Sequence, residues 1–145
     1  MNHKKEYENL LIENNDFSIY GDYSLQCLKE DLLTLLSNRK RSLLSFFHLS
    51  SYPKVRINLC KNSELYNEFR TRFENEEARI SICYNRVENM PQNQLFLFLR
   101  FSILNAFIKK LYSSILIDNP LWLETGLAIN LSGEKLNRYF AKLKI

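Results

Sequence analysis

The sequence predicts a single α+β domain, in which a small sheet of about three strands packs on a long helix and a helical C-terminal half follows. Three observations lead to this prediction. Three short segments alternate between apolar and polar residues, as half-buried strands do. One long segment repeats leucine at helical spacing, and most of the chain after Pro91 is also helical in pattern. With 145 residues, 46% of them hydrophobic, the chain can bury one core, so we treat residues 1–145 as one domain.

The N-terminal part is expected to place one strand before the long helix. Residues 1–15 open with polar and charged side chains, and we expect a flexible or helical extension there. The alternation over residues 17–20 predicts a short strand that stops at Gly21. Ser24 can then cap a helix that ends near His48. The apolar residues of this helix are Leu25, Leu28, Leu32, Leu35, Leu36, Leu43 and Phe47.

Two further strands and a short helix follow. Residues 54–60 alternate between apolar and polar side chains and predict a half-buried strand. A short helix is expected to begin at Asn62 or Ser63, and residues 78–85 alternate again and predict a third strand.

The remainder of the chain is expected to be helical. Residues 93–112 form an apolar helix pattern that Asn119 and Pro120 interrupt. A further helix is predicted over residues 121–131, and an amphipathic one over residues 134–144.

The distribution of charge argues against some partners. The formal net charge is +4, and the bases are spread among acidic residues. A nucleic-acid interface would gather its bases on one face, so we expect solvated basic side chains and no nucleic-acid partner. The bases are Arg39, Lys40 and Arg41, Arg70 and Arg72, Lys109 and Lys110, and in the tail Lys135, Arg138, Lys142 and Lys144.

The composition also bears on location and cofactors. Cys27, Cys60 and Cys83 are odd in number and form no CxxC pair, so we expect buried thiols in a cytoplasmic protein. The first apolar run, residues 10–12, is too short for a signal peptide. Arg100 and two lysines interrupt the apolar segment after Pro91, which favours a buried helix over a membrane span. Only three glycines are present, which excludes a phosphate-binding loop.

One motif points to a family. Residues 120–133 read PLWLETGLAINLSG. This segment resembles the WLxEGLAxxLSG helix of gluzincin metallopeptidases, especially the peptidase MA-like group. The expected order of elements before it, from residue 17 onward, is similar to that family as well. The resemblance implies a zincin-like fold, in which the glutamate directly before the glycine is the third zinc ligand.

The residues that would hold zinc in this family are missing here. The family's active-site helix carries HExxH, because histidines four residues apart share one helix face and the intervening glutamate activates the metal-bound water. The corresponding helix has no histidine, and the resemblance places Ser102, Ile103 and Ala106 at these positions. Thr125 takes the place of the third ligand. Glu124 lies one residue early, which turns its side chain by about 100°. We therefore expect no catalytic residue, no metal and no cofactor.

The resemblance also suggests where a partner could bind. In the family, the edge strand beside the active-site helix receives extended substrate by strand addition, and residues 78–85 correspond to that strand. Trp122 and Glu124 each have a simpler alternative, as a core residue and as an exposed carboxylate. The small side chains of the former ligand positions leave either an open cleft or one that Phe101 and Phe107 fill, and we favour the filled form. The candidate groove contacts are Asn105, Trp122, Glu124, Ile82 and Tyr84.

Neither histidine restores a catalytic site. His3 stands close to the N-terminus, and His48 stands at the expected end of the long helix, where a capping role is the simpler interpretation. Cys27 and Cys83 fit helix and strand patterns, which favours inert thiols over nucleophiles.

Three functions remain compatible with these patterns. The sequence favours a catalytically inactive metallopeptidase-like protein that binds a peptide or protein partner. The first alternative is a small regulatory or immunity-type interaction protein that uses its basic helices. The second is a metal-free hydrolase, for which no set of residues can be named. Neither the partner nor the oligomeric state follows from the sequence.

Overall fold

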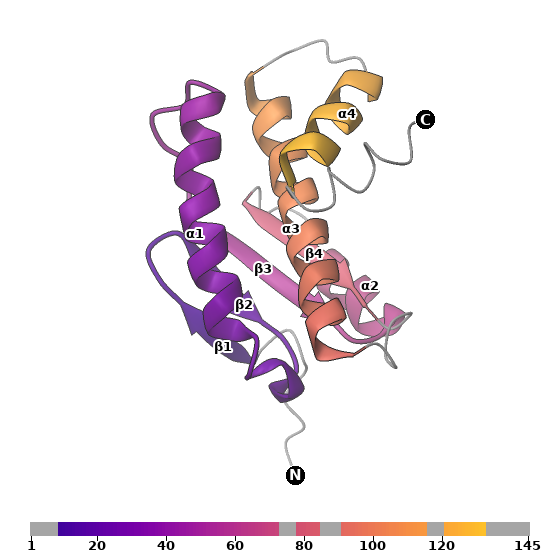
Figure 1. Cartoon of the computed structure of the whole chain (residues 1–145). Helices are drawn as coiled ribbons and strands as arrows, with labels where there is room; N and C mark the ends of the chain where they lie inside the picture. The colour runs from indigo at the N-terminus through magenta and orange to yellow at the C-terminus, as the bar shows by residue number, and fades with distance from the viewer. Residues whose placement is uncertain (1–8, 73–77, 85–90, 116–120, 133–145) are drawn as a thin grey trace, which may run out of the picture.

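The computed structural model describes residues 9–72, 78–84, 91–115 and 121–132, which contain strands, α-helices and one 3-10 helix (Figure 1). In chain order they are β1 (Leu10–Glu13), β2 (Phe17–Tyr20), the 3-10 helix η2 (Tyr23–Leu25), α1 (Lys29–Phe46), β3 (Val55–Cys60), α2 (Ser63–Arg72), β4 (Arg79–Cys83), α3 (Gln92–Ile115) and α4 (Leu121–Ser132).

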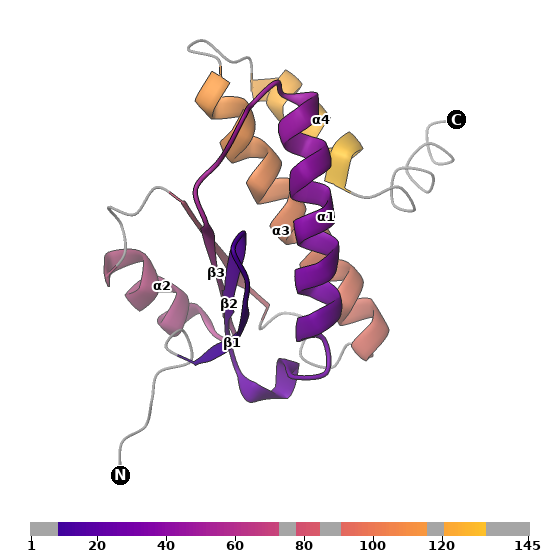
Figure 2. The ribbon, with the colours of Figure 1, turned by 90° about the vertical axis from the view of Figure 1, so that its left-hand side faces the viewer.

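The strands form one mixed sheet in the order β1-β2-β3-β4. β1 is antiparallel to β2, whereas β2, β3 and β4 run parallel. Figure 2 shows the sheet between two helical layers, with α1 and α3 on one side and α2 on the other. The α+β class is therefore confirmed. The sheet has four described strands rather than about three.

The additional strand lies where we expected a flexible or helical extension. Leu10–Glu13 forms β1 and pairs with β2 through a tight turn at Asn14. The side-chain Oδ1 of Asn14 accepts hydrogen bonds from the main-chain N–H groups of Asp16 (2.8 Å) and Phe17 (2.9 Å). Only Leu11 of this short strand is buried. A single buried residue produces no alternation, which is why the sequence pattern missed the strand.

The long helix begins later than expected, and this exposes one cysteine. Residues Tyr23–Leu25 form η2, and α1 starts at Lys29. Leu25 and Leu28 turn into the core, whereas Cys27 between them is exposed. The prediction that Cys27 is a buried thiol is therefore wrong, because the helical spacing on which it rested does not extend through this turn.

The C-terminus of α1 explains His48. The backbone of His48 has a φ of 58°, in the left-handed region. Its N–H donates to the carbonyl of Ser45 (3.1 Å), and the N–H of Leu49 donates to the carbonyl of Leu44 (2.8 Å). These are the two hydrogen bonds of a Schellman motif, so His48 occupies the position that terminates the helix.

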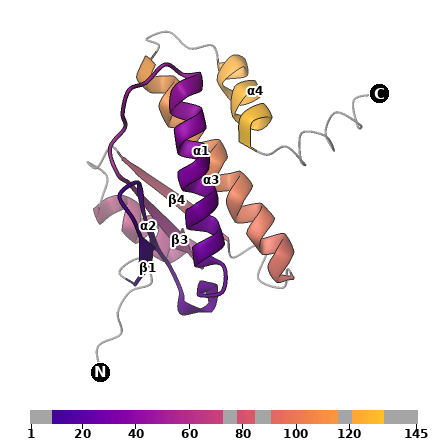
Figure 3. The same cartoon turned by 60° about the vertical axis from the view of Figure 1, so that its left-hand side comes forward.

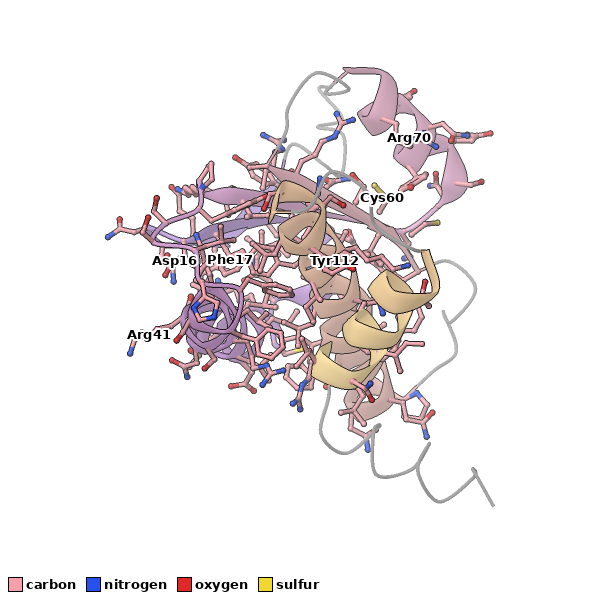
Figure 4. All side chains as sticks on the ribbon, turned by 90° about the horizontal axis from the view of Figure 1, so that it is seen from above. Asp16, Phe17, Arg41, Cys60, Arg70 and Tyr112 are labelled. Atoms are coloured by element: carbon pink, nitrogen blue, oxygen red, sulfur yellow. The ribbon has the colours of Figure 1, made fainter. Side chains whose placement is uncertain are left out.

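The two faces of the sheet differ in composition. The apolar face, which α1 and α3 cover, contributes buried residues to the main core: Phe17, Ile19, Val55, Ile57, Leu59 and Ile80. The polar face, on the side of α2, carries the alternate residues: Ser18, Tyr20, Arg56, Asn58, Cys60, Arg79, Ser81 and Cys83. Figure 4 shows Phe17 on the helical side of the sheet and Cys60 on the side of α2.

The C-terminal helices complete the apolar layer. α3 extends the predicted helix by a few residues, and α4 packs against α3, beside its C-terminal half (Figures 1 and 3). No helix in the described part of the chain is both long and apolar enough to span a bilayer. The helix expected over residues 134–144 lies outside the described residues.

Candidate functional site

The positions that the family resemblance assigns to the zinc site lie on two packed helices, α3 and α4. On α3, Ser102 and Ala106 are half-buried, and Asn105 beside them is half-buried as well. Ile103, which the resemblance aligns with the catalytic glutamate, is fully buried in the main core. Thr125 on α4 is half-buried. The side chain of Ile103 therefore faces the core.

Phe107 lies on α3, one residue after Ala106. Its side chain is fully buried, and its ring packs edge-on against Phe17 (5.7 Å between centroids) and Tyr52 (5.6 Å). Phe101 is half-buried. Phe107 is therefore a core residue.

α4 is held against the rest of the domain from two sides. Ala128 is fully buried in the core, and the Arg39 guanidinium on α1 donates a hydrogen bond to the carbonyl of Leu131. Packing does not require a glycine at position 126, because a Cβ added to Gly126 would meet no atom within 4 Å. Trp122 and Glu124 belong to this helix, but their side chains lie outside the described residues.

The two groove candidates on the third predicted strand face the helices. Ile82 in β4 is half-buried against the main core. Tyr84, directly after β4, is 5% exposed, and its N–H donates to the carbonyl of Cys60 (3.0 Å). The side chain of Tyr84 is thus part of the core, and little of it is accessible to a ligand.

Unlike these buried side chains, some main-chain groups of β4 point to the outer side of the sheet. The carbonyl of Ala78 accepts a hydrogen bond from the N–H of Arg56 (2.9 Å), and Tyr84 donates to β3 as described above. Main-chain groups alternate in direction along a strand, so residues 78, 80, 82 and 84 bond toward β3. The N–H and C=O of Ser81 consequently point away from β3, toward the outer side of the sheet.

Sequence reasoning missed the burial of Lys40. We expected a solvated base, but only 4% of Lys40 is exposed. Its Nζ lies 3.5 Å from a carboxylate oxygen of Asp16, and it donates to the carbonyls of Tyr52 (3.2 Å) and Pro53 (3.4 Å). The same Nζ is 5.5 Å from the ring centroid of Phe17, and Figure 4 shows Asp16 and Phe17 beside α1. This lysine therefore ties α1 to the β1–β2 turn and to the loop before β3.

A signal for this burial was present in the sequence. Lys40 stands four residues after Leu36 and three before Leu43, and both leucines are buried. Residues at these spacings share one helix face, so the apolar stripe of α1 passes through Lys40.

Two pockets in the described part of the chain lie away from the former ligand positions. One pocket of 480 Å³ is lined by Cys27, Leu28, Asp31, Gln92, Asn93, Phe96 and Leu97. The other, of 390 Å³, is lined by Tyr52, Lys109, Lys110, Ser113 and Ser114. The first combines a thiol, a carboxylate and two amides, but its lining includes no histidine that could act as a base toward Cys27.

The described residues hold no cluster of three or more histidine, cysteine, aspartate or glutamate side chains arranged to bind a metal ion. His48 is exposed at the end of α1. His3 lies outside the described residues.

Comparisons with known proteins add no support to the family resemblance. No family model matches the chain, and neither the curated proteins nor the solved structures contain a significant match to it. The likeness to gluzincins therefore rests on residues 120–133 and on the order of the elements before them.

Proposed function

We propose that the protein is a non-catalytic, zincin-like module that binds an extended segment of a peptide or protein partner along β4. The observation that carries this proposal is the position of β4. It is the last strand of the described sheet, and the main-chain groups of Ser81 point to the outer side. Strand addition to such an edge gives affinity through main-chain hydrogen bonds.

The side chains of β4 suggest which partner sequence would fit. Ile80 and Ile82 face the helical layer, whereas Arg79 and Ser81 face the side of α2. A strand added beside β4 would continue both faces, because side chains alternate in direction. We therefore expect a partner segment in which apolar residues alternate with polar ones.

The residues of α3 support a proposed function that needs no bound metal ion. The helix contains no histidine, aspartate or glutamate, so it offers none of the side chains with which a zinc peptidase binds and uses its metal. Ile103, at the place of the general base, is also fully buried.

Selection of peptides from a displayed random library, followed by NMR titration of the bound sequences, tests the proposal. We expect the amide signals of residues 78–84 to shift most. Ser81→Pro removes the outward N–H without touching the hydrogen bonds to β3, and should weaken binding roughly tenfold or more. Ser81→Ala keeps the N–H and is the matched control, which should bind like the original protein.

Two outcomes would contradict the proposal. Binding that persists in Ser81→Pro but disappears when Lys135, Arg138 and Lys142 are changed to glutamate would assign the contact to the basic tail. Metal analysis that finds stoichiometric, tightly held zinc, together with peptidase activity, would refute the non-catalytic role. Circular dichroism of each variant shows whether the fold is retained.

A further inference from the structure

Cys60 and Cys83 lie side by side on neighbouring strands. They are register partners in the parallel pair β3–β4. Adjacent strands in a sheet are about 4.8 Å apart, and register partners point to the same face. The preceding residues on each strand, Leu59 and Ile82, face the main core. Both thiols therefore point to the polar face, where Figure 4 shows Cys60.

A buried amide accompanies these thiols. Asn58 precedes Cys60 by two residues on the same face and is fully buried. Its Nδ2 donates to Sγ of Cys60, and its Oδ1 is buried with no hydrogen-bond partner. The unpartnered carbonyl oxygen is a destabilising feature of this buried layer.

We propose that Cys60 and Cys83 form a dithiolate site for one monovalent copper ion. Thiolates select soft ions, chiefly Cu(I), Zn(II) and iron–sulfur clusters. Zinc in a structural site takes four ligands, and iron–sulfur clusters use four cysteines. The register pair of β3 and β4 supplies two thiols. Cu(I) is satisfied by two thiolates. Binding releases both thiol protons to solvent and leaves the copper oxidation state unchanged.

The exposure of the two cysteines defines the route of entry. Cys60 is fully buried, whereas Cys83 is half-buried on the last strand of the described sheet. The ion therefore reaches Cys83 first. This site uses side chains on the polar face and is independent of the main-chain edge of β4. The exposed Cys27, in the pocket between the start of α1 and the start of α3, provides an internal control.

Anaerobic titration of the reduced full-length protein with Cu(I), supplied as its bicinchoninate complex, tests the proposal. We expect the original protein and Cys27→Ser to remove one copper per chain from the chelator and to develop ultraviolet thiolate-to-copper absorption. Cys83→Ser and Cys60→Ser each lose one of two ligands. Their affinity should fall on the order of 100-fold or more, beyond the effect of changes outside the first coordination shell.

Stability gives a second readout. Copper should raise the unfolding midpoint of the original protein and of Cys27→Ser, but not that of Cys83→Ser. Cys83 is only half-buried, so this variant carries the test if Cys60→Ser fails to fold. Retention of stoichiometric copper by Cys83→Ser, or its loss in Cys27→Ser, would overturn the proposal. A reduced protein that takes up no copper but forms a Cys60–Cys83 disulfide with oxidised glutathione would overturn it in favour of a redox pair.

Discussion

The apolar and polar faces of the sheet are built on the same strands, yet they differ in what they bury. The apolar face buries large aliphatic and aromatic side chains against α1 and α3, including Phe17, Ile57 and Leu59, each with no exposed surface. The polar face buries Ser18, Asn58 and Cys60, and places Arg56 over the ring of Tyr20 at 3.8 Å. Burial is thus nearly complete on both faces of β3, but only one of them gains the free energy of an apolar core.

The two faces of the sheet therefore differ in role: the apolar face stabilises the fold, and the polar face carries the groups that could bind a ligand. On the apolar side, Ile103 and Phe107 have no exposed surface. The residues of the proposed copper site, two thiols beside a buried amide, are on the opposite face. The resemblance to a peptidase concerns α3 and α4, whereas the polar groups of the described sheet lie on the side of α2.

The largest effect is expected from truncation on the apolar side. Phe107→Ala removes a fully buried ring that contacts Phe17 and Tyr52, and should lower the free energy of unfolding by about 3–5 kcal/mol. Urea denaturation followed by circular dichroism measures this change. Leu97→Ala, on the same helix with 40% exposure, is the control and should cost less than about 1 kcal/mol. Equal losses in both variants would show that the layer of α3 is not the core.

A smaller loss is expected from the one charge that enters the apolar layer from α1. Lys40→Met keeps the length of the side chain but removes the donor to the carbonyls of Tyr52 and Pro53, and should destabilise the fold by about 1–3 kcal/mol. Lys54→Met is the control. Its ion pair with Glu13 (2.7 Å) is 43% and 48% exposed, so its loss should cost less than about 1 kcal/mol. A stabilising Lys40→Met would mean that desolvation of the lysine outweighs its contacts.

The smallest effect has the opposite sign and comes from the polar face. Asn58→Val replaces a buried amide with one unsatisfied oxygen by a residue that suits a strand, and should raise the free energy of unfolding by about 1 kcal/mol. Ile57→Val, at the preceding residue, is the control and should lower the free energy of unfolding by about 0.5–1.5 kcal/mol. Thermal unfolding of both variants measures these changes in stability. Destabilisation by Asn58→Val would show that the polar layer contributes to the stability of the fold.

Much of the fold could be predicted because the pattern of each element is local. Strands β2, β3 and β4 and helices α2, α3 and α4 were expected within a few residues of their observed bounds, since each carries its own periodicity. β1 was missed because it buries only Leu11, and the start of α1 was misplaced because η2 precedes it. Lys40 was assigned to solvent by residue type, although its spacing from Leu36 and Leu43 indicated burial.

The candidate sites could be predicted only in part. The absence of a zinc-binding set on α3 follows from residue types alone. The pairing of Cys60 with Cys83 does not, because it depends on the register between two strands separated by a helix. Taken singly along the chain, these cysteines look like inert thiols.

By itself, the sequence determined most of the helices and strands, which face of each is apolar, and which metal ligands α3 lacks. Those properties depend on neighbours within a few residues. The tertiary structure alone decided the parallel register of β3 and β4, the pairing of Lys40 with Asp16, and the place of β4 at the end of the described sheet. These depend on contacts between distant segments, whose free energy comes from burying both partners together and leaves no periodic trace in either segment.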